Sequence, residues 1–176
     1  SFFQVNTLQA EWMIDLVGDY LCLKEGETLV DAYAGVGTFA SVLASRVGKV
    51  IAIEESSSAV EDGKSISVDV SNLKFIVGRT EDVLKNLEMP VDALILDPPR
   101  IGCHPDALNA VIKIRPSRVV YVSCDPLSLA RDLAVLVKGG YEVTEVKPVD
   151  MFPQTYHTEC VANLRYVDES ALLMSS

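Results

Sequence analysis

The stretch GETLVDAYAGVGTFA, residues 26–40, indicates the fold class, because it joins a strand, a glycine turn and the start of a helix. Residues 26–33 are a short, largely apolar run of the kind found in buried strands. Gly35 and Gly37 provide the backbone freedom that a tight turn needs, and a helical pattern follows to about residue 46. A buried strand that leads directly into a helix is typical of a parallel sheet.

The same alternation continues to the end of the chain. Further strands are predicted at residues 49–54, 73–77, 91–97, 118–124, 141–150 and 160–167. Helices are predicted at residues 8–23, 56–68, 80–87, 106–113 and 126–137. Because the strands are almost continuously apolar and most are separated by helices, they indicate a sheet covered on both faces. The predicted fold class is α/β, doubly wound, with a mostly parallel seven-stranded sheet and an antiparallel C-terminal hairpin.

Length and composition fit a single domain. The chain has 176 residues, 49% of them hydrophobic, and we expect one domain at residues 1–168 and a disordered tail at 169–176. The four cysteines are scattered without a C-x-x-C pair, which predicts free thiols in the cytoplasm and no metal site. No apolar stretch approaches the roughly 18 residues of a membrane span. The net charge of −10 disfavours non-specific binding to nucleic acids, and the oligomeric state cannot be predicted.

The glycine turn indicates a nucleotide-like ligand. Gly35-x-Gly37-x-x-Ala40 satisfies the dinucleotide fingerprint, and Glu54 ends the next strand, where an acid can accept the hydroxyl groups of a ribose. Asp31 precedes the glycines; a carboxylate there would repel phosphates but attract a sulfonium or amino group. S-adenosylmethionine therefore fits better than NAD. The alternative interpretation is a strand-to-helix turn without a ligand.

The segment DPPR, residues 97–100, follows the predicted strand 91–97. Two successive prolines fix the backbone and remove two hydrogen-bond donors, so we expect a stiff ledge at the carboxyl edge of the sheet. Asp97 would face the same crevice as Gly35 and Glu54, while Pro98 and Arg100 would position a substrate. The alternative is a turn that only ends the strand.

Cys124 follows the strand 118–124 and immediately precedes a predicted helix. Asp125 can cap that helix and Pro126 suits its first turn. The positive end of the helix dipole favours a thiolate, although a nearby Asp125 charge would oppose it. We therefore expect a reactive thiol at the carboxyl edge of the sheet. The alternative is a small buried apolar side chain.

Five segments together carry a family resemblance. They are FFQVN (2–6), DAYAGVGTF (31–39), DPPRIG (97–102), YVSCDPLSLARDL (121–133) and DMFPQTYHTECV (150–161). From about residue 2 to 166 the chain resembles the catalytic domain of the RNA 5-methyluridine methyltransferase family, which has a Rossmann-like class I methyltransferase fold. The resemblance implies transfer of a methyl group from S-adenosylmethionine to carbon-5 of a uridine in tRNA or rRNA, with S-adenosylhomocysteine as the second product.

The resemblance also implies roles for individual residues. Cys124 would be the nucleophile that forms a covalent adduct with uracil, Glu159 the base, and Phe152 a stacking partner for the target base or a core residue. The residues implied for the cofactor site are Gln4, Tyr33, Gly35, Gly37, Thr38, Glu54 and Asp97. The RNA-binding domain that usually precedes this domain in the family is absent from these residues. Two alternatives therefore stay open: a cofactor-binding fragment without activity of its own, and an NAD-linked Rossmann oxidoreductase.

Overall fold

The computed structural model describes residues 7–150 and 158–167. Its helices are α1 (Thr7–Leu21), α2 (Thr38–Leu43), the 3-10 turn η1 (Ala44–Arg46), α3 (Ser57–Ile66), α4 (Thr80–Lys85), α5 (Pro105–Ile114) and α6 (Pro126–Lys138). Its strands are β1 (Thr28–Ala32), β2 (Lys49–Glu54), β3 (Leu73–Val77), β4 (Ala93–Leu96), β5 (Arg118–Ser123), β6 (Tyr141–Val149) and β7 (Glu159–Tyr166). Each of these strands lies at a position predicted from the sequence.

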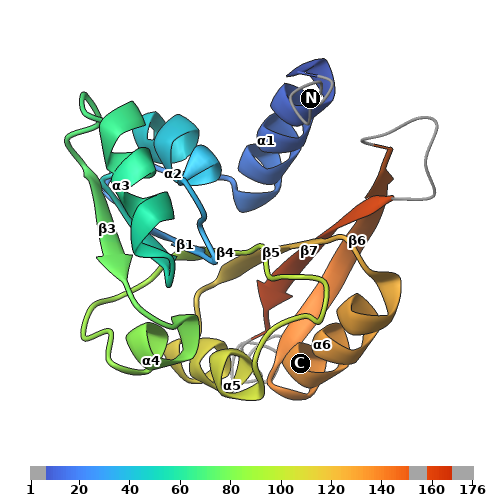
Figure 1. Cartoon of the computed structure of the whole chain (residues 1–176). Coiled ribbons are helices and arrows are strands. Elements are labelled where there is room, and N and C mark those ends of the chain that lie inside the picture. Colours follow the sequence, from blue (N-terminus) through green and yellow to red (C-terminus); the bar gives the residue numbers. More distant parts are fainter. Residues whose placement is uncertain (1–6, 151–157, 168–176) are drawn as a thin grey trace.

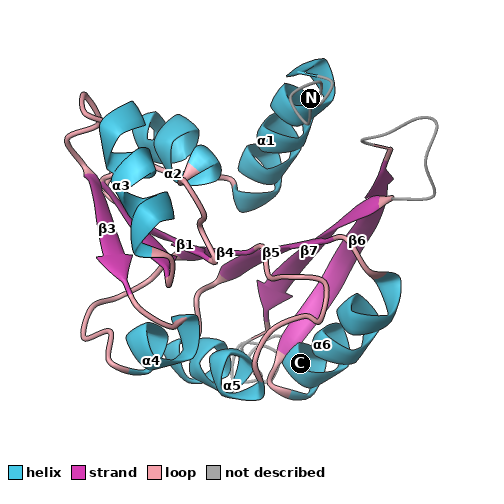
Figure 2. Ribbon diagram, in the orientation of Figure 1, coloured by secondary structure: helices cyan, strands magenta, loops and turns pink. Residues whose placement is uncertain are grey.

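The strands form one seven-stranded sheet in the order β3-β2-β1-β4-β5-β7-β6 (Figures 1 and 2). The first five strands of that order are parallel, and β7 runs antiparallel to both β5 and β6. The predicted fold class is confirmed, including the C-terminal hairpin. From β1 the chain builds outward in one direction through β2 and β3, and in the other through β4 and β5. The carboxyl ends of β1 and β4 therefore flank a topological switch point, where open α/β sheets bind ligands.

Helices cover both faces of the sheet. Figure 1 shows α1, α2 and α3 on one side and α4, α5 and α6 on the other. Successive strand residues point to opposite faces, so that in β1 the side chain of Leu29 packs in the core beneath α1 and α2, and that of Val30 packs in the core beneath α5 and α6. Two apolar cores therefore hold the sheet rigid beneath the loops at its carboxyl edge.

The end of α1 is fastened to the sheet by Arg118, the first residue of β5. Its guanidinium donates hydrogen bonds of 2.8 Å to the carbonyl oxygens of Leu21 and Cys22, and it pairs with Glu27 at 2.6 Å. Carbonyl groups in the last turn of a helix have no partner within the helix, and the guanidinium satisfies two of them here. The contact ties α1 to the edge of the sheet opposite the site described below.

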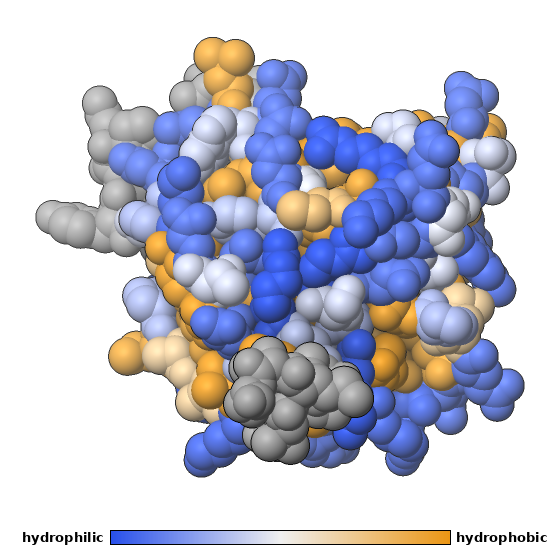
Figure 3. Space-filling view, turned by 180° about the vertical axis from the view of Figure 1, so that it is seen from behind, coloured by the Kyte–Doolittle hydropathy of each residue, from blue (hydrophilic) through white to orange (hydrophobic). Residues whose placement is uncertain are grey.

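Hydrophilic side chains cover most of the face that Figure 3 shows, with smaller apolar areas between them. Within residues 7–150 and 158–167, no helix is both long and apolar enough to cross a bilayer. All four cysteines are free thiols, as predicted.

Candidate active site

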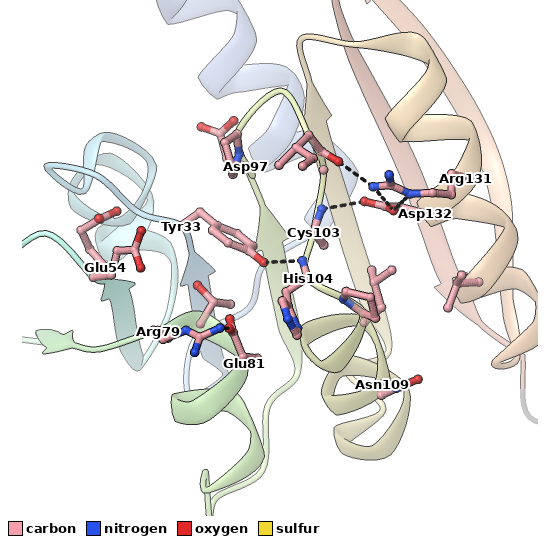
Figure 4. Close-up of a pocket in the computed structure, with 18 of the residues that line it drawn as sticks. Tyr33, Glu54, Arg79, Glu81, Asp97, Cys103, His104, Asn109, Arg131 and Asp132 are labelled. Carbon is pink, nitrogen blue, oxygen red and sulfur yellow. Dashed lines mark hydrogen bonds and ion pairs between the residues drawn. The ribbon is translucent and has the colours of Figure 1, made fainter.

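A cavity of about 920 Å³ lies at the carboxyl edge of the parallel strands, between their loops and the helices α5 and α6 (Figure 4). Residues from the loops after β1, β2, β3 and β4 all contribute to its wall. The wall residues labelled in Figure 4 are Tyr33, Glu54, Arg79, Glu81, Asp97, Cys103, His104, Asn109, Arg131 and Asp132. The cavity therefore sits at the switch point between β1 and β4, as expected for this topology.

The glycine turn after β1 has the left-handed backbone that its sequence predicts. Gly35 has φ 57° and Gly37 has φ 77°. A Cβ atom at Gly37 would come within 2.7 Å of the Phe75 ring, whereas one at Gly35 would meet nothing within 4 Å. Gly37 is thus required for packing, while Gly35 leaves its backbone open toward the cavity that it lines. Thr38, exposed, begins α2 directly after this turn.

Glu54 holds the glycine turn in place. One of its carboxylate oxygens accepts the Gly35 N–H at 2.8 Å, and the other accepts the Ser56 N–H at 2.9 Å. Each carboxylate oxygen can accept a second hydrogen bond, so these contacts leave acceptors available toward the cavity that Glu54 lines. Its predicted contact with a ribose stays a prediction.

Asp31 is fully buried in β1, just before the glycine turn. One carboxyl oxygen accepts the Ala40 N–H at 3.0 Å, and the other has no hydrogen-bond partner within the described part of the chain. Burial raises its pKa to about 8, and the nearby charges of Asp97 and Glu54 act in the same direction. A buried acceptor without a partner is costly, and a cationic ligand group would relieve that cost.

Asp97 follows β4 and lines the cavity (Figure 4). The residue is exposed as a whole, but desolvation of its carboxyl by neighbouring protein atoms, together with the charge of Glu159, raises its pKa to about 7. Two carboxyl groups with raised pKa values therefore stand at this edge of the sheet. Such a site favours a ligand that brings positive charge.

Cys124 lies where the sequence predicts, exposed between β5 and α6. Asp125 caps α6 by accepting the Ser128 N–H at 2.8 Å, and Pro126 occupies the first turn, as expected. The expected thiolate is not favoured, because burial and the charge of Glu159 raise the pKa of Cys124. The positive charge of Arg100 acts in the opposite direction but does not prevail.

The register of β5 and β7 brings Cys124 and Glu159 together. Ser123 at the end of β5 pairs with Cys160 of the antiparallel β7. One step further lie Cys124, just past the end of β5, and Glu159, the first residue of β7, so the register places these two residues near each other. The interaction of the Glu159 charge with the Cys124 thiol agrees with this placement.

Other predicted residues have different places. Pro98 is buried and Arg100 is exposed, with its carbonyl oxygen 3.0 Å from the hydroxyl of Ser128 in α6. Gln4 and Phe152 lie outside the described residues. Tyr33 lines the cavity with a left-handed φ of 61°, and its hydroxyl accepts the His104 N–H at 3.3 Å.

Asp132 is a wall residue that the sequence analysis missed. Its carboxylate, 1% exposed, accepts hydrogen bonds from the Cys103 N–H at 2.8 Å and the Tyr121 hydroxyl at 2.6 Å. Arg131 pairs with the same carboxylate at 2.9 Å and donates to the carbonyl oxygen of Ile101 at 2.6 Å. An acid in the middle of an amphipathic helix usually faces solvent, so its sequence context does not signal this role. No group of three or more potential metal ligands is found among the described residues.

Comparison with known proteins finds relatives that are described as RNA methyltransferases. A family model described as tRNA (Uracil-5-)-methyltransferase matches residues 1–166. An uncharacterized RNA methyltransferase of Oceanobacillus iheyensis is 43% identical over 169 residues, which are 93% of this chain and 37% of that protein. An uncharacterized RNA methyltransferase of Synechocystis is 44% identical over 171 residues, covering 96% and 37%. The chain thus spans less than two fifths of the length of these relatives.

Solved structures give the same picture. The tRNA (uracil-54, C5)-methyltransferase of Pyrococcus abyssi, in complex with S-adenosyl-L-homocysteine, superposes with a TM-score of 0.79 at 36% identity, over 93% of this chain and 40% of that one. An rRNA methylase of Streptococcus thermophilus superposes with a TM-score of 0.74 at 16% identity, over 88% and 96%. The second likeness concerns the fold alone.

Proposed function

Because the chain belongs to the tRNA (uracil-5-)-methyltransferase family, we propose that it transfers a methyl group from S-adenosylmethionine to carbon-5 of a uridine in cytoplasmic tRNA or rRNA. The observation that carries the proposal is the proximity of Cys124 and Glu159 to each other and to Asp97, which lines the acidic cavity beside the glycine turn. The family assignment also removes the support for an NAD-linked oxidoreductase.

The cavity suits S-adenosylmethionine on its own chemistry. The sulfonium and ammonium groups of S-adenosylmethionine would stabilise the charged forms of Asp31 and Asp97, whose pKa values are raised to about 8 and about 7. Gly35 leaves room for close approach of the ligand, and Glu54 and Tyr33 complete the wall. When bound, S-adenosylmethionine supplies an electrophilic methyl group, which carbon-5 receives as S-adenosylhomocysteine departs.

Cys124 activates the uracil ring. Carbon-5 of uracil is a weak nucleophile, so electrons must first be supplied to it. The Cys124 thiol first loses its proton to solvent. The resulting thiolate forms a bond to carbon-6 of the ring, and the electron pair of the ring double bond moves onto carbon-5 and its neighbouring carbonyl as an enolate. Carbon-5 then carries the electron density needed to form the new carbon–carbon bond.

Glu159 completes the reaction. Its carboxylate removes the proton from methylated carbon-5, and the freed electron pair re-forms the ring double bond while the bond between carbon-6 and the Cys124 sulfur breaks. The thiolate is thereby released, and the proton rests on Glu159. A base separate from the sulfur is needed because the sulfur is still bound to the ring when the proton leaves.

The proposal is tested by incubating the protein with isotope-labelled S-adenosylmethionine and RNA from cells that lack it. We expect labelled 5-methyluridine in the digested RNA, identified by mass spectrometry. Cys124→Ala should abolish the label, and Glu159→Gln should stop turnover after a single methyl transfer. Cys160→Ala, which changes the neighbouring thiol, serves as the control and should retain activity. Label on another nucleoside, or full activity of Cys124→Ala, would contradict the proposal.

A further inference from the structure

Two large apolar side chains stand unusually exposed beside the nucleophile. Leu127, in the first turn of α6, is 82% exposed, and Ile101, in the loop after β4, is 76% exposed. Leu127 is three residues beyond Cys124, and Ile101 follows Arg100, whose charge acts on the Cys124 thiol. We call this pair, Ile101 and Leu127, the apolar lip.

The loop that bears Ile101 is bound to the helix that bears Leu127. The carbonyl oxygen of Arg100 accepts the Ser128 hydroxyl at 3.0 Å, and the carbonyl oxygen of Ile101 accepts the Arg131 guanidinium at 2.6 Å. The lip thus belongs to a single fixed unit of loop and helix.

Gly102 holds that loop against the helix. It has φ 87°, and a Cβ atom at this position would collide with the Arg131 guanidinium and come within 2.7 Å of the Asp132 carboxylate. A glycine in this conformation lets the backbone approach two charged side chains closely. The loop therefore keeps Ile101, which also lines the cavity, in an exposed position next to α6.

We propose that the apolar lip packs against nucleobases of the RNA next to the target uridine. This inference rests on the proposed function and adds to it a surface that selects the substrate. A uridine that reaches Cys124 must leave its stack, and its neighbours then expose apolar faces that the lip can cover.

Local positive charge indicates that RNA, rather than a second copy of the chain, covers the apolar lip. Arg100 and Arg131 are exposed next to the lip and offer guanidinium groups to phosphates. The net charge of −10 acts against both occupants, so the choice of RNA rests on these two guanidinium groups and on the neighbouring Cys124. The lip also adjoins Cys124, which the proposed reaction requires RNA to contact.

The test is steady-state methyl transfer by Ile101→Ser, Leu127→Ser and the double variant, with RNA and S-adenosylmethionine varied separately. Each single change should raise the half-saturating RNA concentration about tenfold, because contacts of one partly buried aliphatic side chain are lost. The half-saturating concentration of S-adenosylmethionine should stay as in the wild type for Leu127→Ser; this comparison uses Leu127 alone, because Ile101 also lines the cavity. Because both side chains are exposed, the variants should fold normally.

Matched controls are Ile66→Ser and Val68→Ser, which remove apolar side chains of similar exposure, 73% and 78%, at the far end of α3. These controls should behave as the wild type. If the half-saturating RNA concentration is unchanged in the lip variants, or changes equally in the controls, the lip does not contact RNA. That result would leave the proposed methyltransferase activity unaffected. If the wild type is a dimer and Leu127→Ser dissociates it, a second copy of the chain covers the apolar lip, which would also contradict the proposed contact with RNA. A wild type that methylates no RNA would refute the proposed function itself.

Discussion

Cys124 and Glu159 are neighbours because of strand register rather than sequence proximity. Each can be selected from the sequence, Cys124 by its place before a helix and Glu159 through a family resemblance. Their contact depends on β7 entering the sheet between β5 and β6, with Ser123 opposite Cys160. Since strand order is a long-range property, the sequence could not predict that the acid would raise the pKa of the thiol.

The charge of Glu159 should be measurable at the thiol itself. Because the pKa of Cys124 is raised, its reaction with iodoacetamide should accelerate only above the ordinary pH range of a thiol. Glu159→Gln removes one cause of that increase and should shift the rate profile of Cys124 to lower pH. Peptide mass spectrometry measures the rate at each thiol, and the exposed Cys22 in the same sample is the control. Identical profiles in both proteins would show that Glu159 does not act on Cys124.

The buried Asp31 should make the ligand-free protein less stable as pH rises. Its pKa is about 8 in the folded chain, against an ordinary value of 3.8, so the folded state binds an extra proton between those values. The stabilisation is complete below the ordinary pKa and is lost as pH rises toward the folded one. The melting temperature should fall between about pH 5 and about pH 8, and Asp31→Asn should reduce that fall. An equal fall in both proteins would contradict the raised pKa.

At the scale of elements, the loop from Asp97 to Cys103 connects the cavity to the nucleophile. Residues from both halves of the loop line the cavity, and its second half is also bound to α6, the helix that Cys124 precedes. The sequence predicted the helices and strands well because their apolar runs are continuous. It could not predict the hydrogen bond between the Asp132 carboxylate and the backbone of this loop, because a charged residue within a helix normally indicates a solvated face.

Loss of the Asp132 carboxylate should be costly. Asp132→Ala leaves the Cys103 N–H and the Tyr121 hydroxyl buried without their acceptor, and we expect a loss of about 2–4 kcal/mol in the free energy of unfolding. Tyr121→Phe removes one of these hydrogen bonds and leaves only the weak S–H donor of Cys103 without its acceptor, so it should cost about 1 kcal/mol. Urea denaturation measures both. An Asp132→Ala variant no less stable than Tyr121→Phe would show that the carboxylate does not hold the loop.

At the scale of the whole molecule, the alternation of strands and helices determined the α/β class, and the switch point between β1 and β4 determined where the cavity forms. The sequence correctly placed the carboxyl edge as the site. The net charge of −10 would be unusual for a protein that acts on RNA, so under the proposed function the guanidinium groups near Cys124 would supply the local attraction.

That charge predicts a weak response to salt. Few phosphates should be neutralised by this chain, so its affinity for RNA should fall less than about tenfold between about 50 and about 200 mM salt. Fluorescence anisotropy with a labelled RNA fragment measures the affinity at each salt concentration. A fall of about a thousandfold would reveal an extended basic surface that the charge balance does not suggest.

The central claim is that the sulfur of Cys124 bonds to carbon-6 of a uracil while a methyl group is delivered to carbon-5. The most direct measurement is mass spectrometry of the protein after incubation with S-adenosylmethionine and RNA that contains 5-fluorouridine, whose carbon-5 carries no proton for Glu159 to remove. We predict a stable adduct that maps to the Cys124 peptide, carries one transferred methyl group and is absent from Cys124→Ala. Methylation of ordinary RNA by this protein without any such adduct would contradict the account.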